Sequence, residues 1–235
     1  MNYKSILLGV IVVIILYLVY TYVFADNSSV NLYSGGNAKR SVTVPAKQLT
    51  GNPASVDFTY SIWIYVNNWQ YQYGTGKTIF RRVNTKTGVV SPGVALSTYT
   101  NNLTVTFTTY NTRTRGQKQE NWEINNIPIQ RWCNIILASN NRAIDTYVDG
   151  KLVNTKVLGG VPKVDKLANV VICPDGGFAG EVAKFRYYAR TLNPREAYQI
   201  YREGPGGNWL SDLISQYKVK FSFLKRGEEI NSFEI

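Results

Sequence analysis

Two patterns of hydrophobic positions divide the chain into unequal parts. The first is a run of nineteen uncharged residues, Ile6 to Phe24, which follows a single lysine at position 4. As a helix this run would be about 28 Å long, close to the ~30 Å hydrocarbon core of a bilayer. After Asp26 the pattern changes to short runs in which apolar and polar residues alternate. Such alternation is typical of β-strands that are buried on one face.

The apolar run predicts a retained transmembrane anchor over residues 1–25. It is longer than the ~7–15-residue core of a signal peptide, and its tyrosines gather toward one end as in an interfacial aromatic belt. A cleaved signal peptide, suggested by the small residue Ala25, and a buried core helix are the alternatives. The numbers of basic residues close to the two ends of the apolar run are nearly equal. The side of the membrane that the domain of this expected single-pass protein would face therefore stays open. The residues assigned to the anchor, and to contact with the lipid bilayer, are Ile6, Leu7, Val10, Ile14, Leu18 and Phe24.

Ten short runs after residue 55 alternate in polarity and are separated by Gly, Asn, Asp and Pro. This spacing predicts an all-β fold, an antiparallel sandwich or jelly roll, with residues 41–46 as an edge strand. Asp149-Gly150 is the clearest hairpin signal, because this pair accepts the positive φ angles of a tight turn. The predicted strands are 56–66, 77–83, 93–98, 103–109, 118–124, 132–139, 143–149, 151–158, 169–173 and 181–190.

One short helix is predicted near residues 194–203. Asn193 can cap it, Pro194 suits its first position, Glu196 completes a capping box, and Gly204 ends it. The alternating residues 217–235 predict two final strands joined around 225–229. The domain organisation expected from these patterns is an anchor at 1–25, a stalk at 26–40 and the sandwich at 41–206, followed by a β-rich extension at 207–235 that packs on the sandwich.

Composition excludes several kinds of catalytic and metal site. The 235 residues contain no histidine, which removes His-dependent triads and His metal ligands. Cys133 and Cys173 lie in apolar runs, which favours buried free thiols, with one disulfide between them as the alternative. Glu120 and Glu123 are three apart, so a strand would place them on opposite faces rather than as a catalytic pair. We therefore expect no enzymatic activity, no metal and no cofactor.

The net charge of +11 suits an anionic partner such as lipid headgroups or acidic glycan. The basic residues are spread along the chain and no nucleic-acid-binding motif accompanies them, which argues against nucleic acid as the partner.

Two local patterns are candidate surfaces for a partner protein or a glycan. Trp69, Tyr71 and Tyr73 alternate with glutamines, so an extended segment would place the three rings on one face. Packing of these rings under a loop is the alternative interpretation. Arg113 and Arg115 alternate on a predicted hairpin and would form a basic edge. The alternative there is a solvated edge that discourages aggregation between strands.

Three stretches of the chain resemble the concanavalin A-like, laminin G-like jelly-roll family. They are residues 58–66 (FTYSIWIYV), 131–153 (from RWCNIILA to YVDGKLV) and 178–197 (FAGEVAKFRYYARTLNPREA). The resemblance covers roughly residues 40–206 and implies the jelly-roll topology. Members of the family include lectins, adhesion modules, glycan hydrolases and structural proteins, so the fold alone does not fix the function.

The anchor, the short stalk and the jelly roll are together similar to single-pass laminin G-like proteins of large double-stranded DNA viruses. That resemblance implies a non-enzymatic structural protein, a minor capsid or virion membrane protein that links an internal membrane to a protein shell. Its partners would be the bilayer and other capsid or membrane-associated proteins. The alternative is a membrane-anchored, lectin-like adhesion protein whose residues 69–73 bind glycans.

Overall fold

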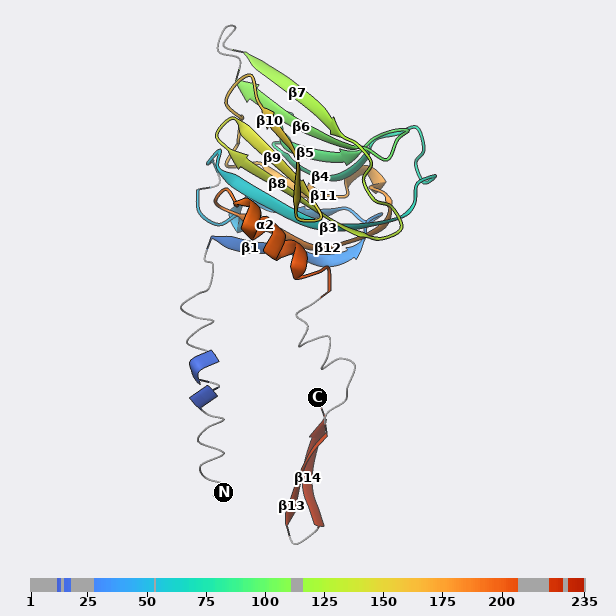
Figure 1. The fold of residues 1–235 in the computed structure, drawn as a ribbon, viewed down its shortest axis with the longest axis vertical. Helices are drawn as coiled ribbons and strands as arrows, with labels where there is room; N and C mark the ends of the chain where they lie inside the picture. Colours follow the sequence, from blue (N-terminus) through green and yellow to red (C-terminus); the bar gives the residue numbers. More distant parts are fainter. Residues whose placement is uncertain are drawn as a thin grey trace.

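The computed structural model describes residues 12–13, 15–17, 28–52, 54–110, 116–206, 220–225 and 228–234, the last two ranges as backbone. Two six-stranded antiparallel sheets stack face to face in a sandwich, as Figure 1 shows. The first sheet has the order β1 (Ser29–Asn37), β12 (Ala179–Tyr188), β3 (Phe58–Asn68), β8 (Trp132–Asn140), β9 (Ala143–Val148) and β10 (Lys151–Val157). The second has the order β2 (Val42–Val44), β11 (Asn169–Ile172), β4 (Lys77–Val83), β5 (Val90–Leu96), β6 (Leu103–Tyr110) and β7 (Gln117–Ile124).

Each of the ten predicted runs forms a strand, and residues 42–44 form the predicted edge strand. The remaining elements are the 3-10 helices η1 (Ala46–Gln48) and η2 (Pro174–Gly176), the helix α2 (Pro194–Arg202), and a hairpin of β13 (Lys220–Lys225) and β14 (Glu228–Glu234). The all-β antiparallel sandwich is therefore confirmed, together with its short helix and its two closing strands.

The alternation along β3 explains the two layers of packing in the sandwich. Phe58, Tyr60 and Ile62 point into the core between the sheets, where they are almost fully buried. Trp63 lies on the outer face of the first sheet, which helix α2 crosses (Figure 1). A second apolar cluster under the helix seals this face; it consists of Ile136, Ala138, Tyr147, Tyr188, Leu192, Ala197 and Ile200.

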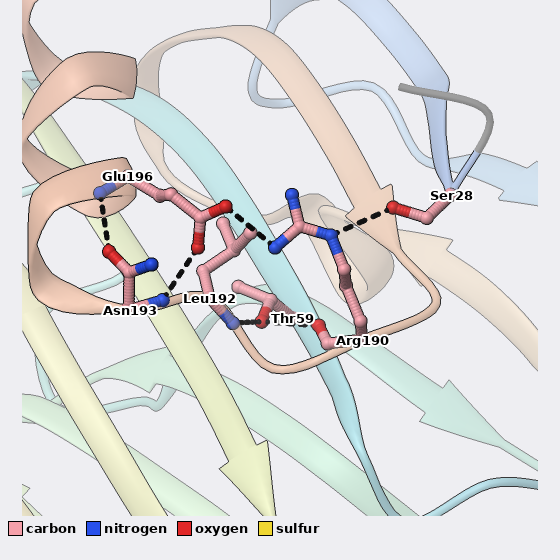
Figure 2. A network of polar contacts seen from close by, with 6 residues as sticks. All are labelled: Ser28, Thr59, Arg190, Leu192, Asn193 and Glu196. Atoms are coloured by element: carbon pink, nitrogen blue, oxygen red, sulfur yellow. Dashed lines mark hydrogen bonds and ion pairs between the residues drawn. The ribbon is translucent and has the colours of Figure 1, made fainter.

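A capping box begins α2 and fixes where the helix lies. The Asn193 side chain accepts the backbone N–H of Glu196 at 3.0 Å, and the Glu196 carboxylate accepts the backbone N–H of Asn193 at 2.8 Å (Figure 2). Glu196 also pairs with Arg190 at 2.8 Å, and Arg190 donates to the Ser28 hydroxyl at 3.1 Å. These bonds tie the helix start to the residue that precedes β1.

Replacing Asn193 tests the contribution of this cap. We expect Asn193→Ala to lower the free energy of unfolding by about 1 kcal/mol, because the N–H of Glu196 loses its acceptor. Asn193→Asp keeps a capping oxygen and should stay within about 0.5 kcal/mol of the wild type. Urea denaturation followed by circular dichroism measures both, and equal stability of the alanine and aspartate variants would contradict the prediction.

The prediction of a stalk at residues 26–40 is wrong for residues 29–37, which form β1 and pair with β12. The Asn, Ser and Gly content concealed a strand in which Leu32 is buried in the core. Gly35 fits against β12 because it lacks a side chain; a Cβ there would come 2.8 Å from the carbonyl oxygen of Val182. Small residues thus mark close packing here, where composition alone had indicated a linker.

The predicted anchor residues Ile6, Leu7, Val10, Ile14, Leu18 and Phe24 lie outside the described residues. Within the described ranges, no helix combines the length and apolar character that crossing a membrane requires. The predicted packing of residues 207–235 on the sandwich depends on residues 207–219, which are also outside the described ranges, and it stays a prediction.

Candidate functional site

Five connections gather at one end of the sandwich, on the right in Figure 1. Because neighbouring strands are antiparallel, the strands β3, β5, β7, β9 and β11 end here and the strands that follow them begin here. We call this end the loop rim; it comprises residues 69–76, 97–102, 125–131, 149–150 and 173–178. Hydrogen bonds join adjacent loops, among them Ile127 N–H to Asn101 O at 2.7 Å and Gly74 N–H to Thr98 O at 3.3 Å.

A pocket of about 740 Å³ opens at the loop rim, and we call it the rim pocket. Its walls are the loop between β7 and β8, the hairpin of β9 and β10, and helix α2. A volume of this size is in the range of small-molecule and sugar sites. The residues that line it are Glu123, Ile124, Asn125, Asn126, Ile127, Pro128, Arg131, Val148, Asp149, Lys151, Val153, Asn154, Tyr198 and Tyr201.

Two aromatic rings of helix α2, those of Tyr198 and Tyr201, form one wall of the rim pocket. The ring of Tyr201 stacks on buried Trp63, with centroids 5.8 Å apart and planes 17° apart. Tyr198 lies one turn earlier on α2. Its ring centroid is 6.2 Å from that of Tyr201, and 49% of its surface is exposed. Stacking on a buried tryptophan restrains Tyr201, so the outermost ring stands on a rigid support.

The Asp149-Gly150 turn brings the hairpin of β9 and β10 against α2. Gly150 has a φ of +73°, and a Cβ at this position would lie 2.9 Å from the Cβ of Tyr201 and 3.2 Å from the Cα of Tyr198. Glycine is required here both for the positive φ and for the close approach. The predicted hairpin turn thus also builds the pocket.

The carboxylates that line the rim pocket are already engaged by neighbouring groups. Asp149 pairs with Arg131 at 2.6 Å, and its second oxygen accepts the backbone N–H of Asn134 at 2.9 Å. Glu123 accepts a hydrogen bond from the Asn102 side chain at 2.9 Å and a longer one from Ser97 at 3.4 Å. Both carboxylates are therefore fixed in the pocket wall by neighbouring groups of the protein.

Amide side chains supply the remaining hydrogen-bonding groups. Asn125, Asn126 and Asn154 all line the pocket. The side-chain oxygen of Asn154 is buried and has no hydrogen-bond partner in the part of the chain that the structure describes. A buried acceptor without a donor is unfavourable.

The segment with Trp69, Tyr71 and Tyr73 forms turns, so the predicted extended conformation is wrong. Gln72 has a positive φ of 50°, which interrupts the alternation on which that prediction relied. The Gln72 side chain donates to the carbonyl oxygen of Asp175 at 3.0 Å, which ties this loop to the loop before β12.

The three rings consequently have different surroundings. Trp69 packs against the core, with the Lys77 amine 4.5 Å from its ring centroid. The Tyr71 hydroxyl donates to the carbonyl oxygen of Gly176 at 3.2 Å. Tyr73 is exposed and packs edge-on against Tyr99, with centroids 5.6 Å apart. Tyr73 therefore remains as an exposed candidate for partner contact, and Arg113 and Arg115 lie outside the described residues.

The sequence analysis missed Tyr198, Asn154 and the other groups of the rim pocket. It predicted the helix on which Tyr198 lies but made no use of that residue. A usable signal was present, since two tyrosines three positions apart share one side of a helix. What the sequence did not show is that the Asp149-Gly150 turn, which lies far earlier in the chain, packs against those rings.

The two cysteines are free and buried, as predicted. Burial raises the pKa of the Cys173 thiol to about 12 and shifts the pKa of Cys133 upward as well. Both thiols are therefore protonated at neutral pH and are poor nucleophiles. Glu120 and Glu123 are engaged separately, because Glu120 accepts the N–H of Gly159 at 3.0 Å. Among the described residues, no three Cys, Asp or Glu side chains gather into a metal site.

The family model described as the concanavalin A-like lectin/glucanases superfamily matches residues 23–197. The comparison with curated proteins finds no match. The resemblance inferred from the three sequence stretches is thereby confirmed at the level of the superfamily.

Several solved structures share the fold. The ligand-binding domain of botulinum neurotoxin serotype D in complex with N-acetylneuraminic acid has a TM-score of 0.54 at 13% identity, covering 75% of this chain and 42% of its own. The binding domain of Paraclostridial Mosquitocidal Protein 1 has a TM-score of 0.53 at 15% identity, covering 71% and 42%. The binding domain of botulinum neurotoxin DC in complex with rat synaptotagmin II has a TM-score of 0.51 at 18% identity, covering 69% and 40%. The chain spans about two-fifths of each, and the likeness shows the fold alone.

Proposed function

The chain belongs to the concanavalin A-like lectin/glucanase superfamily, and we propose that it is a non-enzymatic recognition module that binds a glycan in the rim pocket. The observation that carries this proposal is the aromatic wall that ends in exposed Tyr198, facing a set of amide side chains. A sugar ring offers an apolar C–H face for stacking and hydroxyl groups for amides. The rim pocket provides a counterpart for each.

The state of the acids supports binding rather than hydrolysis. A glycoside hydrolase needs two carboxylates that flank the scissile bond, one of them able to hold a proton. Asp149 is engaged by Arg131 and by the backbone N–H of Asn134. Glu123, at the end of β7, accepts a hydrogen bond from the Asn102 side chain. Neither contact leaves a carboxylate free to serve as the acid.

The sequence analysis favoured a shell-linking virion protein, with a lectin as the alternative. The structural neighbours are binding domains, and two of them are titled as complexes with N-acetylneuraminic acid and with SialylT. These titles favour the lectin-like alternative, although they describe other proteins. Attachment to a membrane stays a separate proposal, which rests on the apolar residues 6–24 alone.

A glycan array probed with the full-length chain in detergent tests the proposal. We expect selective binding, and we expect Tyr198→Ala to lower the affinity for the bound glycans about tenfold, because the exposed stacking surface is lost. Tyr198→Phe keeps the ring and should remain within about threefold of the wild type. Tyr110→Ala is the matched control, since Tyr110 is equally exposed at the opposite end of β6.

Two results would contradict the proposal. One is the absence of glycan binding combined with cross-linking of the chain to a protein shell, which would support the structural role. The other is selective glycan binding that Tyr198→Ala leaves unchanged, which would move the site away from the rim pocket.

A further inference from the structure

The end of the sandwich opposite the loop rim, on the left in Figure 1, is rich in basic residues. We call it the basic end; its described connections are residues 28, 45–52, 54–57, 84–89, 116, 141–142, 158–168 and 189–193. They hold six bases and two acids, which are Lys47, Lys86, Arg142, Lys163, Lys166 and Arg190, and Asp57 and Asp165. The loop rim and the connection from β1 to β2 beside it together hold three bases and two acids, which are Lys39, Arg40 and Arg131, and Asp149 and Asp175. Positive charge is therefore concentrated at the end away from the rim pocket.

The two acids of the basic end are engaged by backbone groups. The Asp57 carboxylate accepts the backbone N–H of Asn141 at 2.7 Å, and the Asp165 carboxylate accepts the backbone N–H of Leu167 at 2.8 Å. Three exposed lysines of this end pair with no carboxylate of the described residues, and these are Lys47, Lys86 and Lys166. The ammonium groups of these lysines are free to contact an anionic partner.

An exposed leucine lies among these bases. Leu167 is the most exposed large apolar side chain in the part of the chain that the structure describes, at 72%. It lines a pocket of about 540 Å³ together with Lys47 and Lys166. Its turn is held in place, because the carbonyl oxygen of Asp165 accepts the buried Arg82 guanidinium at 2.9 Å. A leucine flanked by lysines suits a bilayer surface, where the apolar side chain enters and the ammonium groups stay among the headgroups.

The chain enters the sandwich at this same end. Ser28 precedes β1, and its carbonyl oxygen accepts the Thr50 hydroxyl at 3.3 Å. Gly51, the next residue, lines the pocket that contains Leu167. Phe24, where the apolar run ends, is four residues before Ser28. Four residues extend over at most about 14 Å, so a bilayer that holds residues 6–24 would lie next to the basic end.

We propose that the basic end docks on an anionic phospholipid bilayer, with Leu167 in the interface and Lys47 and Lys166 against the headgroups. An anionic leaflet attracts basic residues that are held close to it. Docking of this kind is separate from glycan binding, and it presupposes attachment of the chain through residues 6–24. Because the loop rim lies at the other end of the sandwich, docking presents the rim pocket away from the bilayer.

Quenching by lipid tests the docking in the full-length chain. Leu167→Cys and Tyr73→Cys each carry an environment-sensitive fluorophore on the new thiol, and labelling is selective because both native cysteines are buried. The vesicles contain phosphatidylcholine, about 30% phosphatidylserine and a nitroxide-labelled lipid. We expect quenching at position 167 to be at least about threefold stronger than at position 73 on the loop rim. In vesicles without phosphatidylserine, quenching at position 167 should fall at least about twofold, since the negative surface potential is lost.

Charge reversal connects the docking to the named lysines. Lys47→Glu combined with Lys166→Glu, in the Leu167→Cys chain, should lower quenching in the anionic vesicles at least about twofold. Lys39→Glu combined with Arg40→Glu is the matched control, because it changes the net charge equally at two exposed positions beside the loop rim. We expect this control to leave quenching at position 167 unchanged.

Each alternative result overturns a distinct part of the proposal. Equal quenching at positions 167 and 73 would overturn docking through the basic end. Equal quenching at position 167 with and without phosphatidylserine would overturn the role of anionic lipid, and this comparison does not depend on the folding of the charge-reversed chains. Failure of the full-length chain to float with either kind of vesicle would overturn attachment through residues 6–24 and the docking with it. None of these results bears on glycan binding, which the array measures in detergent.

Discussion

Arg82→Ala is expected to lower the free energy of unfolding by about 3–5 kcal/mol, whereas Arg81→Ala, one position earlier, should lower it by less than about 1 kcal/mol. Arg82 is fully buried, and its guanidinium donates to the carbonyl oxygens of Asp165 at 2.9 Å and Ala168 at 3.4 Å. Arg81 forms a partly exposed ion pair with Asp175 at 3.2 Å. Urea denaturation of both variants, followed by circular dichroism, measures the difference.

The large effect expected for Arg82 comes from the groups that it holds in place. Its side chain ties the loop before β11 to β4, so truncation removes the guanidinium donor from both carbonyl oxygens and opens a cavity. Tyr60 and Tyr187 lie close to the guanidinium. Burial raises the pKa of both phenols, although the positive charge of Arg82 opposes this shift. The phenols are therefore neutral at pH 7, and the guanidinium is held by the backbone carbonyl oxygens of Asp165 and Ala168. Equal losses for the Arg81 and Arg82 variants would contradict this explanation.

Gly180→Ala is expected to lower the free energy of unfolding by about 2–3 kcal/mol. Gly180 lies on β12 opposite β3, and a Cβ there would lie 1.9 Å from the carbonyl oxygen of Tyr65 and 3.0 Å from the Phe178 ring. The backbone must shift to accept a methyl group, because the nearest atom belongs to the main chain. The disturbance affects the pairing of β12 with β3 at the loop rim.

Gly76→Ala is the matched control, since a Cβ at that position would meet no atom within 4 Å. We expect its stability to stay within about 0.5 kcal/mol of the wild type. Thermal denaturation of both variants measures the contrast. A Gly180→Ala variant as stable as Gly76→Ala would show that the two strands are not packed as closely as described.

The strands were predictable because each carries its own signal of alternation and turn residues. β4 matches its predicted range of 77–83, and the predicted capping box begins α2 at Asn193. These signals are local, so one sequence suffices to read them. β1 was missed for a related reason, because Gly35 and its polar neighbours imitate the composition of a linker.

The rim pocket was not predictable in the same way, because its walls come from three separate parts of the sequence. Tyr198 on α2 and Asn154 on β10 come together only through the packing of the Asp149-Gly150 turn against the helix. Sequence reasoning singled out Trp69, Tyr71 and Tyr73 as a candidate surface because they alternate along the chain, with packing under a loop as the alternative. The turn at Gln72 separates those rings, and spacing alone carries no signal of such a turn.

The most direct test of the rim pocket as a glycan site is a calorimetric titration of three full-length proteins with one array-selected glycan: the wild type, Tyr198→Ala and Tyr73→Ala. Both tyrosines are exposed, Tyr73 on the loop rim and Tyr198 on α2, and Tyr198 alone of the two lines the pocket. We expect Tyr198→Ala to weaken binding about tenfold and Tyr73→Ala to stay within about twofold of the wild type. The reverse pattern, with loss of affinity in Tyr73→Ala and none in Tyr198→Ala, would contradict it.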